Sequence, residues 1–187
     1  MLLSIFPTKI KKIENFLDQN YINDIILKIK SLPHKNHDAI MGNATSSHFQ
    51  CSNFLKETDL EKKINEEIAK YCALCGYLNN KIAFCWANIQ KKDSFLTMHD
   101  HGSTPIAGAL FLKTDKDSSK LCFENPNPYS KMMSYNVVNK DLNTICFEVQ
   151  IGDLFLFPGW LTHGSNYEYN KSDERIVLSF NCKYIGE

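Results

Sequence analysis

The chain has 187 residues, enough for one domain, and 43% of them are hydrophobic, an ordinary share for a globular protein with a sizeable core. Lys plus Arg and Asp plus Glu number 21 each, so the net charge is zero, which argues against a general nucleic-acid or anionic-membrane binder. No segment approaches the roughly 18 consecutive apolar residues that a transmembrane helix needs.

The seven cysteines are scattered and odd in number, and most stand in apolar runs. This pattern indicates reduced, buried side chains rather than a disulfide framework. The first seven residues are too few for a signal peptide and lack its basic start and its small-residue cleavage site. We therefore expect a cytoplasmic protein.

Helical signals dominate the first eighty residues. Apolar residues form a helical stripe over residues 20–31, and Pro33 ends it. Residues 33–53 are mostly polar and irregular, so we predict a loop in which His34 and His37 are solvated.

A second helix is predicted to begin at Thr58, because residues 58–61 match a capping box, and to end at Gly76 as its C-cap. Cys72 and Cys75 have the spacing of half a zinc site. No second pair follows at zinc-site spacing, and the helical stripe accounts for both, so we assign them to the core.

From residue 81 the sequence changes to short apolar runs separated by clusters of Gly, Pro, Asn and Asp. The runs predicted to be strands are 82–89, 106–112, 120–123, 144–149, 153–157 and 175–181. Many short strands with turns between them indicate a sandwich or barrel. We predict a single, mainly β domain over 1–187, in which a helical N-terminal region, residues 1–80, packs on a jelly roll formed by residues 81–187.

Histidines suggest a metal site in this jelly roll. On an extended chain, residues two apart point the same way, so His99 and His101 share a face and Asp100 points to the other. His163 follows a distant apolar strand, and three imidazoles would form a facial set that leaves other positions of a metal open. A histidine alone on a strand is more often a hydrogen-bonded or surface residue than a metal ligand. The pair His99 and His101 leaves both interpretations open. Asp100 could be a ligand only if a β-bulge broke the strand.

Arg175 opens an apolar strand twelve residues after the third histidine. It would point into the barrel with alternate residues that follow it, namely Val177, Ser179 and Asn181. A buried guanidinium needs an anion, and a carboxylate bound through two parallel N–H···O bonds is its best partner. Considered alone, Arg175 is more simply explained by a structural acid such as Glu174 or Glu148.

Together these residues resemble the 2-oxoglutarate/Fe(II)-dependent oxygenases, and most closely a bacterial and phage group of small oxygenases with an His-x-His motif. The resemblance runs nearly end to end, and its six blocks in order are more specific than any one of them. They are IFPT at 5–8, CWANI at 85–89, HDH at 99–101 with Gly108, FENP at 123–126, GDLFLFPGW at 152–160 with His163, and Arg175 with SFN at 179–181.

The resemblance implies a cupin-like double-stranded β-helix and an oxidoreductase, a hydroxylase of unknown substrate. It implies that His99, His101 and His163 hold Fe(II) and that Arg175 binds the distal carboxylate of the cosubstrate 2-oxoglutarate. O₂ would oxidise the substrate while 2-oxoglutarate becomes succinate and CO₂.

Two positions depart from the wider family. His101 stands where the family usually has Asp, and a three-His site is less selective for iron over zinc or nickel. Val177 stands where the family often has a Ser that binds the same carboxylate, so Ser179 or another polar group would have to replace it. Asn88 and Asn181 are further candidates for contacts with the cosubstrate.

The substrate pocket is less defined. Trp86 shares a strand face with Asn88, although core packing accounts for it more often, and Trp160 either shields the metal or fills the barrel mouth. The expected substrate loops are residues 33–53 and 125–143. The second loop contains Tyr129, Met132, Met133 and Tyr135.

Two alternatives to the oxygenase stay open. The three-His set and Val177 are compatible with a jelly roll that binds a metal or ligand without oxidation. A three-His dioxygenase of the cupin type would need no oxo acid, but the chain lacks its usual Glu beyond His101 and would leave Arg175 without a role. The sequence identifies neither the substrate nor the oligomeric state.

Overall fold

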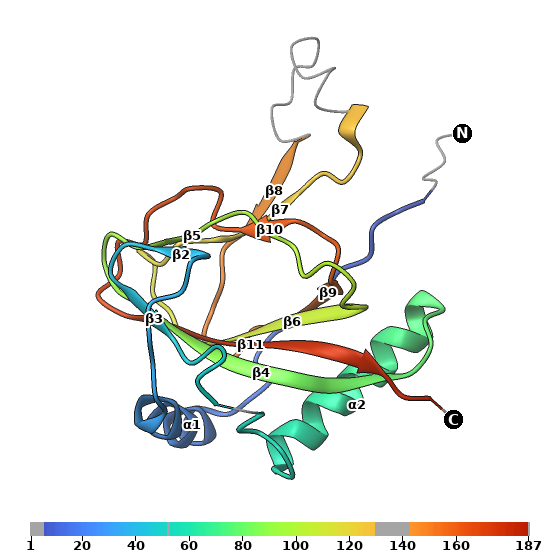
Figure 1. Ribbon diagram of the computed structural model, residues 1–187, viewed down its shortest axis with the longest axis horizontal. Coiled ribbons are helices and arrows are strands. Elements are labelled where there is room, and N and C mark those ends of the chain that lie inside the picture. Colours follow the sequence, from blue (N-terminus) through green and yellow to red (C-terminus); the bar gives the residue numbers. More distant parts are fainter. Residues whose placement is uncertain (1–5, 52, 130–142, 187) are drawn as a thin grey trace.

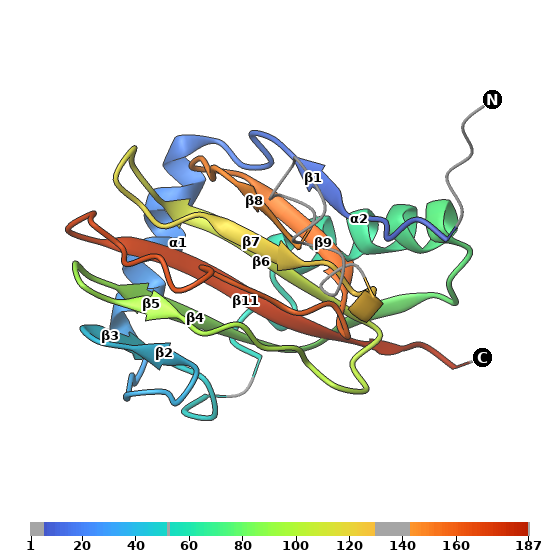
Figure 2. The same cartoon turned by 90° about the horizontal axis from the view of Figure 1, so that it is seen from above.

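The computed structural model describes residues 6–51, 53–129 and 143–186. It contains a six-stranded sheet faced by shorter strands on one side and by two helices on the other (Figure 1). Seen from above, the strands of the smaller sheet lie over those of the larger one (Figure 2). All strand pairs are antiparallel, which confirms the prediction of a mainly β jelly roll.

The strands are arranged in three hydrogen-bonded groups. The large sheet has the order β1 (Lys11–Ile13), β9 (Leu154–Pro158), β6 (Ile106–Lys113), β11 (Arg175–Tyr184), β4 (Asn80–Gln90) and β3 (Ala44–Ser46). The small sheet has the order β10 (His163–Gly164), β7 (Leu121–Glu124) and β8 (Thr144–Phe147). The last group pairs β2 (Ile40–Met41) with β5 (Phe95–Leu96).

Both predicted helices are present. α1 spans Gln19–Ser31 and α2 spans Asp59–Cys75. Thr58 caps α2 by accepting from the N–H of Glu61, and Gly76 ends it in the left-handed conformation. The Glu61 carboxylate accepts from the N–H of Glu57 instead of that of Thr58, so only half of the predicted capping box forms. Among the described residues, no helix combines the length and apolar character needed to cross a bilayer.

The N-terminal region contains strands that the sequence analysis did not predict. Residues 33–53, predicted to be a loop, include β2 and β3, and β1 precedes α1. β5 and β10 were also missed. Each of these strands has two or three residues, too few to display an alternating pattern of apolar and polar side chains.

A disulfide between Cys122 and Cys146 corrects the prediction that all seven cysteines are reduced. The two residues face each other across β7 and β8, with their Cα atoms 4.0 Å apart. Their pairing depends on the register of two strands, which the sequence spacing does not reveal. Disulfides are rare in reducing compartments, so this bond weighs against the cytoplasmic location, which stays a prediction.

Successive side chains of β11 point to opposite faces of the large sheet and belong to two separate apolar clusters. Ile176, Leu178 and Phe180 point toward the helices and join the larger apolar cluster. Val177 points the other way and packs with the aromatic side chains between the two sheets, such as Phe111. Because Arg175 belongs to this second series, the strand period carries it into the space between the sheets.

Candidate metal centre and cosubstrate pocket

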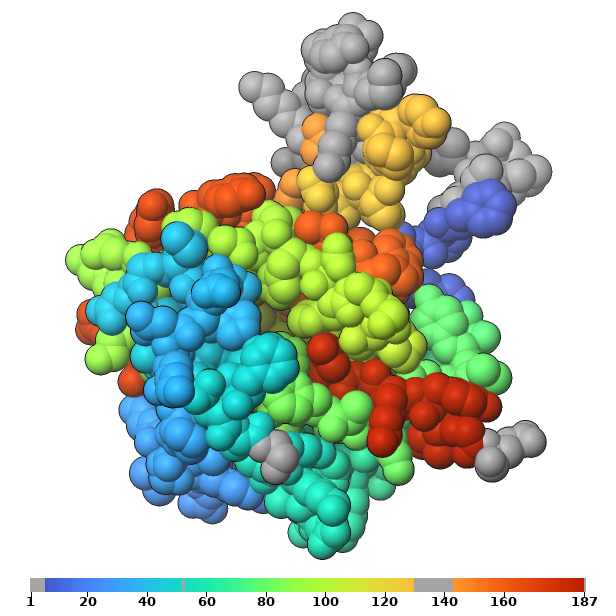
Figure 3. All heavy atoms as spheres, viewed as in Figure 1, coloured from blue at the N-terminus to red at the C-terminus, as the bar shows by residue number. Residues whose placement is uncertain are grey.

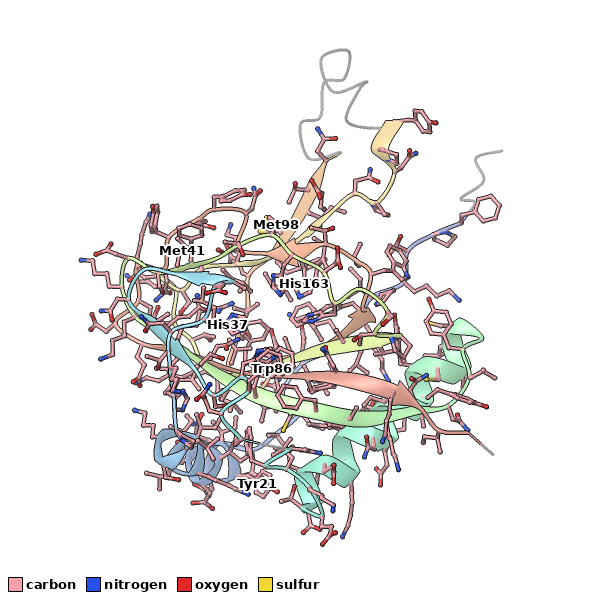
Figure 4. All side chains as sticks on the ribbon, viewed as in Figure 1. Tyr21, His37, Met41, Trp86, Met98 and His163 are labelled. Atoms are coloured by element: carbon pink, nitrogen blue, oxygen red, sulfur yellow. A yellow bond between two sulfur atoms is a disulfide. The ribbon has the colours of Figure 1, made fainter. Side chains whose placement is uncertain are left out.

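Backbone pairing brings the three predicted metal ligands together. His163 in β10 forms an antiparallel bridge with His99, and the N–H of each donates to the carbonyl of the other. The N–H of His101 donates to the carbonyl of Gly159. One potential ligand atom from each histidine lies within 4.8 Å of the other two. The three side chains thus form one cluster, and His163 points into the space between the sheets (Figure 4).

Hydrogen bonds determine which ring nitrogens remain available. Nδ1 of His99 lies 2.8 Å from the carbonyl oxygen of Thr97, and Nδ1 of His163 lies 2.8 Å from that of Leu161. Because a carbonyl only accepts, each Nδ1 carries the proton and each Nε2 keeps a lone pair. Nε2 of His163 is 3.3 Å from Nε2 of His101. Metal-binding histidines are typically oriented by such a bond from the other ring nitrogen, so the cluster fits a divalent cation.

Burial keeps these imidazoles neutral. Desolvation, helped by the neighbouring histidines, lowers the pKa of His163 to about 3 and that of His101 to about 4. Desolvation also lowers the pKa of His99. A metal binds the neutral form of imidazole, so the cluster needs no deprotonation near neutral pH.

We expect the metal-free protein to lose stability as the pH falls from about 7 to about 5. The unfolded chain protonates histidine near its ordinary pKa of 6.5, whereas folded His163 stays neutral down to about pH 3. Between these values the unfolded state binds more protons, so acidification lowers the free energy of unfolding. Thermal unfolding of the metal-free protein at both pH values measures the effect. An equal or higher melting temperature at the lower pH contradicts it.

Asp100 lies outside the cluster. Its side chain is exposed at the edge of the cavity described below, and its Oδ1 accepts from the N–H of Gly102 over 2.8 Å. Within the described parts of the chain, the gathered donor set is therefore three imidazoles with no carboxylate.

Arg175 is the only arginine in the chain, against 20 lysines, and it is only 3% exposed. Burial lowers the pKa of its guanidinium to about 10. Neither structural acid considered from the sequence is its partner, because Glu174 pairs with Lys30 and Lys113, and Glu148 lies near Lys120. The guanidinium instead lies over the ring of Phe111 and donates from Nη1 to the Oε1 of Gln90.

Two buried donors beside this contact have no hydrogen-bond partner among the described residues. They are Nε of Arg175 and Nε2 of Gln90. An unpaired buried donor is costly, and two of them next to a positive charge suit a carboxylate. Sequence reasoning missed Gln90, although it follows Asn88 by two residues in β4 and pairs with Arg175 across the sheet. The strand period alone could have identified it.

A cavity of about 210 Å³ joins the histidine cluster to Arg175. Of the other residues predicted to line it, Trp86, Asn88 and Ser179 do so, together with Val177. The Asn88 side chain is oriented by the hydroxyl of Ser46, which donates to its Oδ1 over 2.7 Å.

Other predicted pocket residues lie elsewhere. Asn181 and Trp160 do not line the cavity, and Trp160 is 49% exposed. Tyr129 is also exposed. The remaining residues named for the second substrate loop, Met132, Met133 and Tyr135, are outside the described residues.

His37 corrects a further prediction. It is not a solvated loop residue, because its Nε2 lies 2.8 Å from Nδ1 of His48, and both side chains line the cavity. His34, also predicted to be solvated, bonds through Nε2 to the carbonyl of Ile29. Segment 33–53 thus brings two more imidazoles to the cavity, and His48 follows β3, which pairs with β4.

Comparison with known proteins gives a family. Residues 84–181, slightly more than half of the chain, match the family model described as "Putative 2OG-Fe(II) oxygenase". This span includes the three clustered histidines, Gln90 and Arg175. None of the curated proteins matches the chain significantly.

Several solved structures have the same fold at low sequence identity. HygX from Streptomyces hygroscopicus, solved with nickel and 2-oxoglutarate, is 12% identical with a TM-score of 0.65, over 95% of this chain and 83% of that one. A 2OG-Fe(II) oxygenase-family oxidoreductase from Burkholderia pseudomallei is 13% identical with a TM-score of 0.66, over 93% and 85%. The viral collagen prolyl hydroxylase of Paramecium bursaria chlorella virus-1, in complex with 2OG, is 13% identical with a TM-score of 0.63, over 94% and 96%.

Proposed function

This chain belongs to the 2OG-Fe(II) oxygenase family, and from that premise we propose that it is a hydroxylase whose iron is held by His99, His101 and His163. Its cofactor is Fe(II), and its cosubstrates are 2-oxoglutarate and O₂. Bound together, they supply the oxidation of a substrate C–H to C–OH, coupled to the conversion of 2-oxoglutarate into succinate and CO₂. The protein supplies position and a secluded pocket.

We assign the distal carboxylate of 2-oxoglutarate to Arg175 and Gln90. The observation that supports this assignment is the pair of unpartnered buried donors, one on each side chain, at the end of the cavity away from solvent. The family often has a Ser at the position of Val177 that binds the distal carboxylate. Gln90 would then donate that hydrogen bond in this chain. Asn88 and Ser179 line the same cavity and are further candidates for cosubstrate contacts.

Family membership favours the oxygenase over a non-oxidative metal-binding jelly roll. It also disfavours a cupin-type dioxygenase that needs no oxo acid, since that protein would have no use for a buried, unpaired Arg175. A single domain and a cytoplasmic location remain proposals from the sequence.

The direct test is formation of succinate from 2-oxoglutarate by protein loaded with Fe(II) without oxygen and then exposed to air with ascorbate. We expect slow succinate release even without a substrate, and a rise in melting temperature when 2-oxoglutarate binds the zinc-loaded protein. Tight zinc binding with no shift by 2-oxoglutarate and no succinate would instead favour the non-oxidative module.

A further inference from the structure

Four aromatic side chains in mutual contact connect the cavity to the surface, and two of them, Trp86 and His48, line the cavity itself. We call Phe84, Trp86, His48 and Phe49 the aromatic wall. Trp86 begins it, with its ring centroid 5.9 Å from that of His101. Phe84 follows at 5.5 Å from Trp86, and Phe49 lies 5.9 Å from Phe84. These two contacts have interplanar angles of only 28° and 30°, so successive rings lie nearly parallel.

The outer end of the wall is exposed. Phe49 is 80% exposed, although it is a large apolar residue, and its φ of +58° lies in the left-handed region that costs a non-glycine residue energy. Its ring lies 3.9 Å from that of His48. Figure 3 shows the surface hollowed where the segment around His48, blue to cyan, meets the green strand segment that carries Trp86. An exposed aromatic side chain on a strained backbone, in contact with the cavity residue His48, suits contact with a ligand.

His48 adds a hydrogen-bond donor to this wall. The N–H of Ala39 donates to Nδ1 of His37, so neutral His37 carries its proton on Nε2. That Nε2–H donates to Nδ1 of His48 over 2.8 Å, which leaves the His48 proton on its own Nε2. This Nε2–H has no hydrogen-bond partner among the described residues, and His48 lines the cavity. The chain of bonds thus fixes one free donor beside the aromatic rings.

The cavity has little charge to offer a substrate. The histidines that line the cavity are neutral. Of the other described residues that line it, only Asp100 and Arg175 carry a formal charge. Arg175 lies at the buried end and is assigned to 2-oxoglutarate, and Asp100 is at the exposed edge, bonded to the N–H of Gly102. Between these two ends the lining side chains are neutral, so a ring held there loses least hydration energy if it is uncharged.

We propose that the substrate carries an uncharged, flat heteroaromatic ring that stacks on the aromatic wall and accepts a hydrogen bond from His48 Nε2–H. Stacking there holds a group attached to the ring beside Trp86 and His101, next to the histidine cluster. This inference rests on the proposed function, because it places the oxidised group of the substrate at that metal.

Three small probes separate the elements of this proposal. 2-Pyridone is flat, aromatic and carries a carbonyl acceptor, 2-piperidone keeps the carbonyl on a saturated ring, and toluene keeps the aromatic ring without an acceptor. Their binding is followed in zinc-loaded, 2-oxoglutarate-bound protein through the indole N–H resonance of Trp86. The chain has two tryptophans, so the Trp160→Phe variant assigns the signal.

We expect 2-pyridone to shift the Trp86 resonance and to bind about two- to tenfold more tightly than either other probe. Phe49→Ala should remove most of its advantage over 2-piperidone, and His48→Phe most of its advantage over toluene. Phe6→Ala is the matched control, because Phe6 is also exposed, at 96%, and has a φ of +53°, but it does not belong to the aromatic wall.

Equal binding of 2-pyridone and 2-piperidone, or equal effects of Phe49→Ala and Phe6→Ala, overturns the proposal. The same samples report 2-oxoglutarate binding by thermal shift. A normal shift without selective ring binding rejects the aromatic-ring substrate alone, and selective ring binding without any shift rejects the oxygenase assignment alone.

Discussion

His163→Ala should abolish stoichiometric iron binding and lower 2-oxoglutarate-dependent succinate formation by roughly a hundredfold or more. The reason is geometric. His163 supplies one of three convergent imidazoles, and its Nδ1 is held by the carbonyl of Leu161 so that Nε2 faces the cluster. Without it, two imidazoles remain, which hold a divalent ion weakly. Metal content after gel filtration and succinate release measure the two effects.

Two controls make this result specific. His34→Ala removes a histidine that bonds to the carbonyl of Ile29 and does not line the cavity, so iron content should stay at one per chain. Asp100→Asn removes the carboxylate nearest in sequence, and it too should keep its iron because Asp100 is exposed and outside the cluster. If Asp100→Asn loses iron while a folded His163→Ala keeps it, the donor set is wrong.

The metal cluster could be predicted from the sequence because of two general properties of β-structure. His99 and His101 share a face by the two-residue period of an extended chain, and that period holds regardless of the rest of the fold. His163 required a further premise, that a jelly roll brings distant strand ends together, and the bridge between His99 and His163 has this geometry. The position of Arg175 followed from strand period as well.

What the sequence analysis missed depends on register between segments far apart in the chain. Gln90 matters because it pairs with Arg175, and the disulfide forms because Cys122 faces Cys146. His48 lies beside the cavity two residues after β3, a three-residue strand that pairs with β4, and His37 is bonded to it. Such pairings are set by the packing of whole sheets, and a short strand carries no periodic signal of its own.

Arg175 lies on β11, and two members of the aromatic wall, Phe84 and Trp86, lie on the neighbouring strand β4. The alternate residues Phe84, Trp86, Asn88 and Gln90 of β4 change from aromatic to polar toward the buried end. Across the sheet, Ser179 pairs with Trp86 and Arg175 with Gln90. One stretch of two-stranded sheet therefore separates the site for an anion from the site proposed for a ring.

Arg175→Met should weaken 2-oxoglutarate binding to the zinc-loaded protein by about a hundredfold, since removing a buried charge that pairs with a carboxylate costs about 2–5 kcal/mol. Arg175→Lys should recover only part of this affinity, because an ammonium keeps the charge but not the planar pair of donors. Gln90→Leu should have a smaller effect, about tenfold, as it removes one neutral donor. Calorimetric titration with 2-oxoglutarate measures all three.

The stability of the ligand-free protein decides whether this effect is direct. Arg175 is buried without an acidic partner among the described residues, and burial depresses the pKa of its guanidinium, so in the absence of an anion its charge is a net cost to the fold. Arg175→Met should therefore leave the melting temperature of the ligand-free protein unchanged or higher while it removes the rise caused by 2-oxoglutarate. Lys113→Met, which breaks an ion pair with Glu174 away from the cavity, should keep that rise. A structural cation would behave in the opposite way: Arg175→Met would unfold at lower temperature and still bind 2-oxoglutarate.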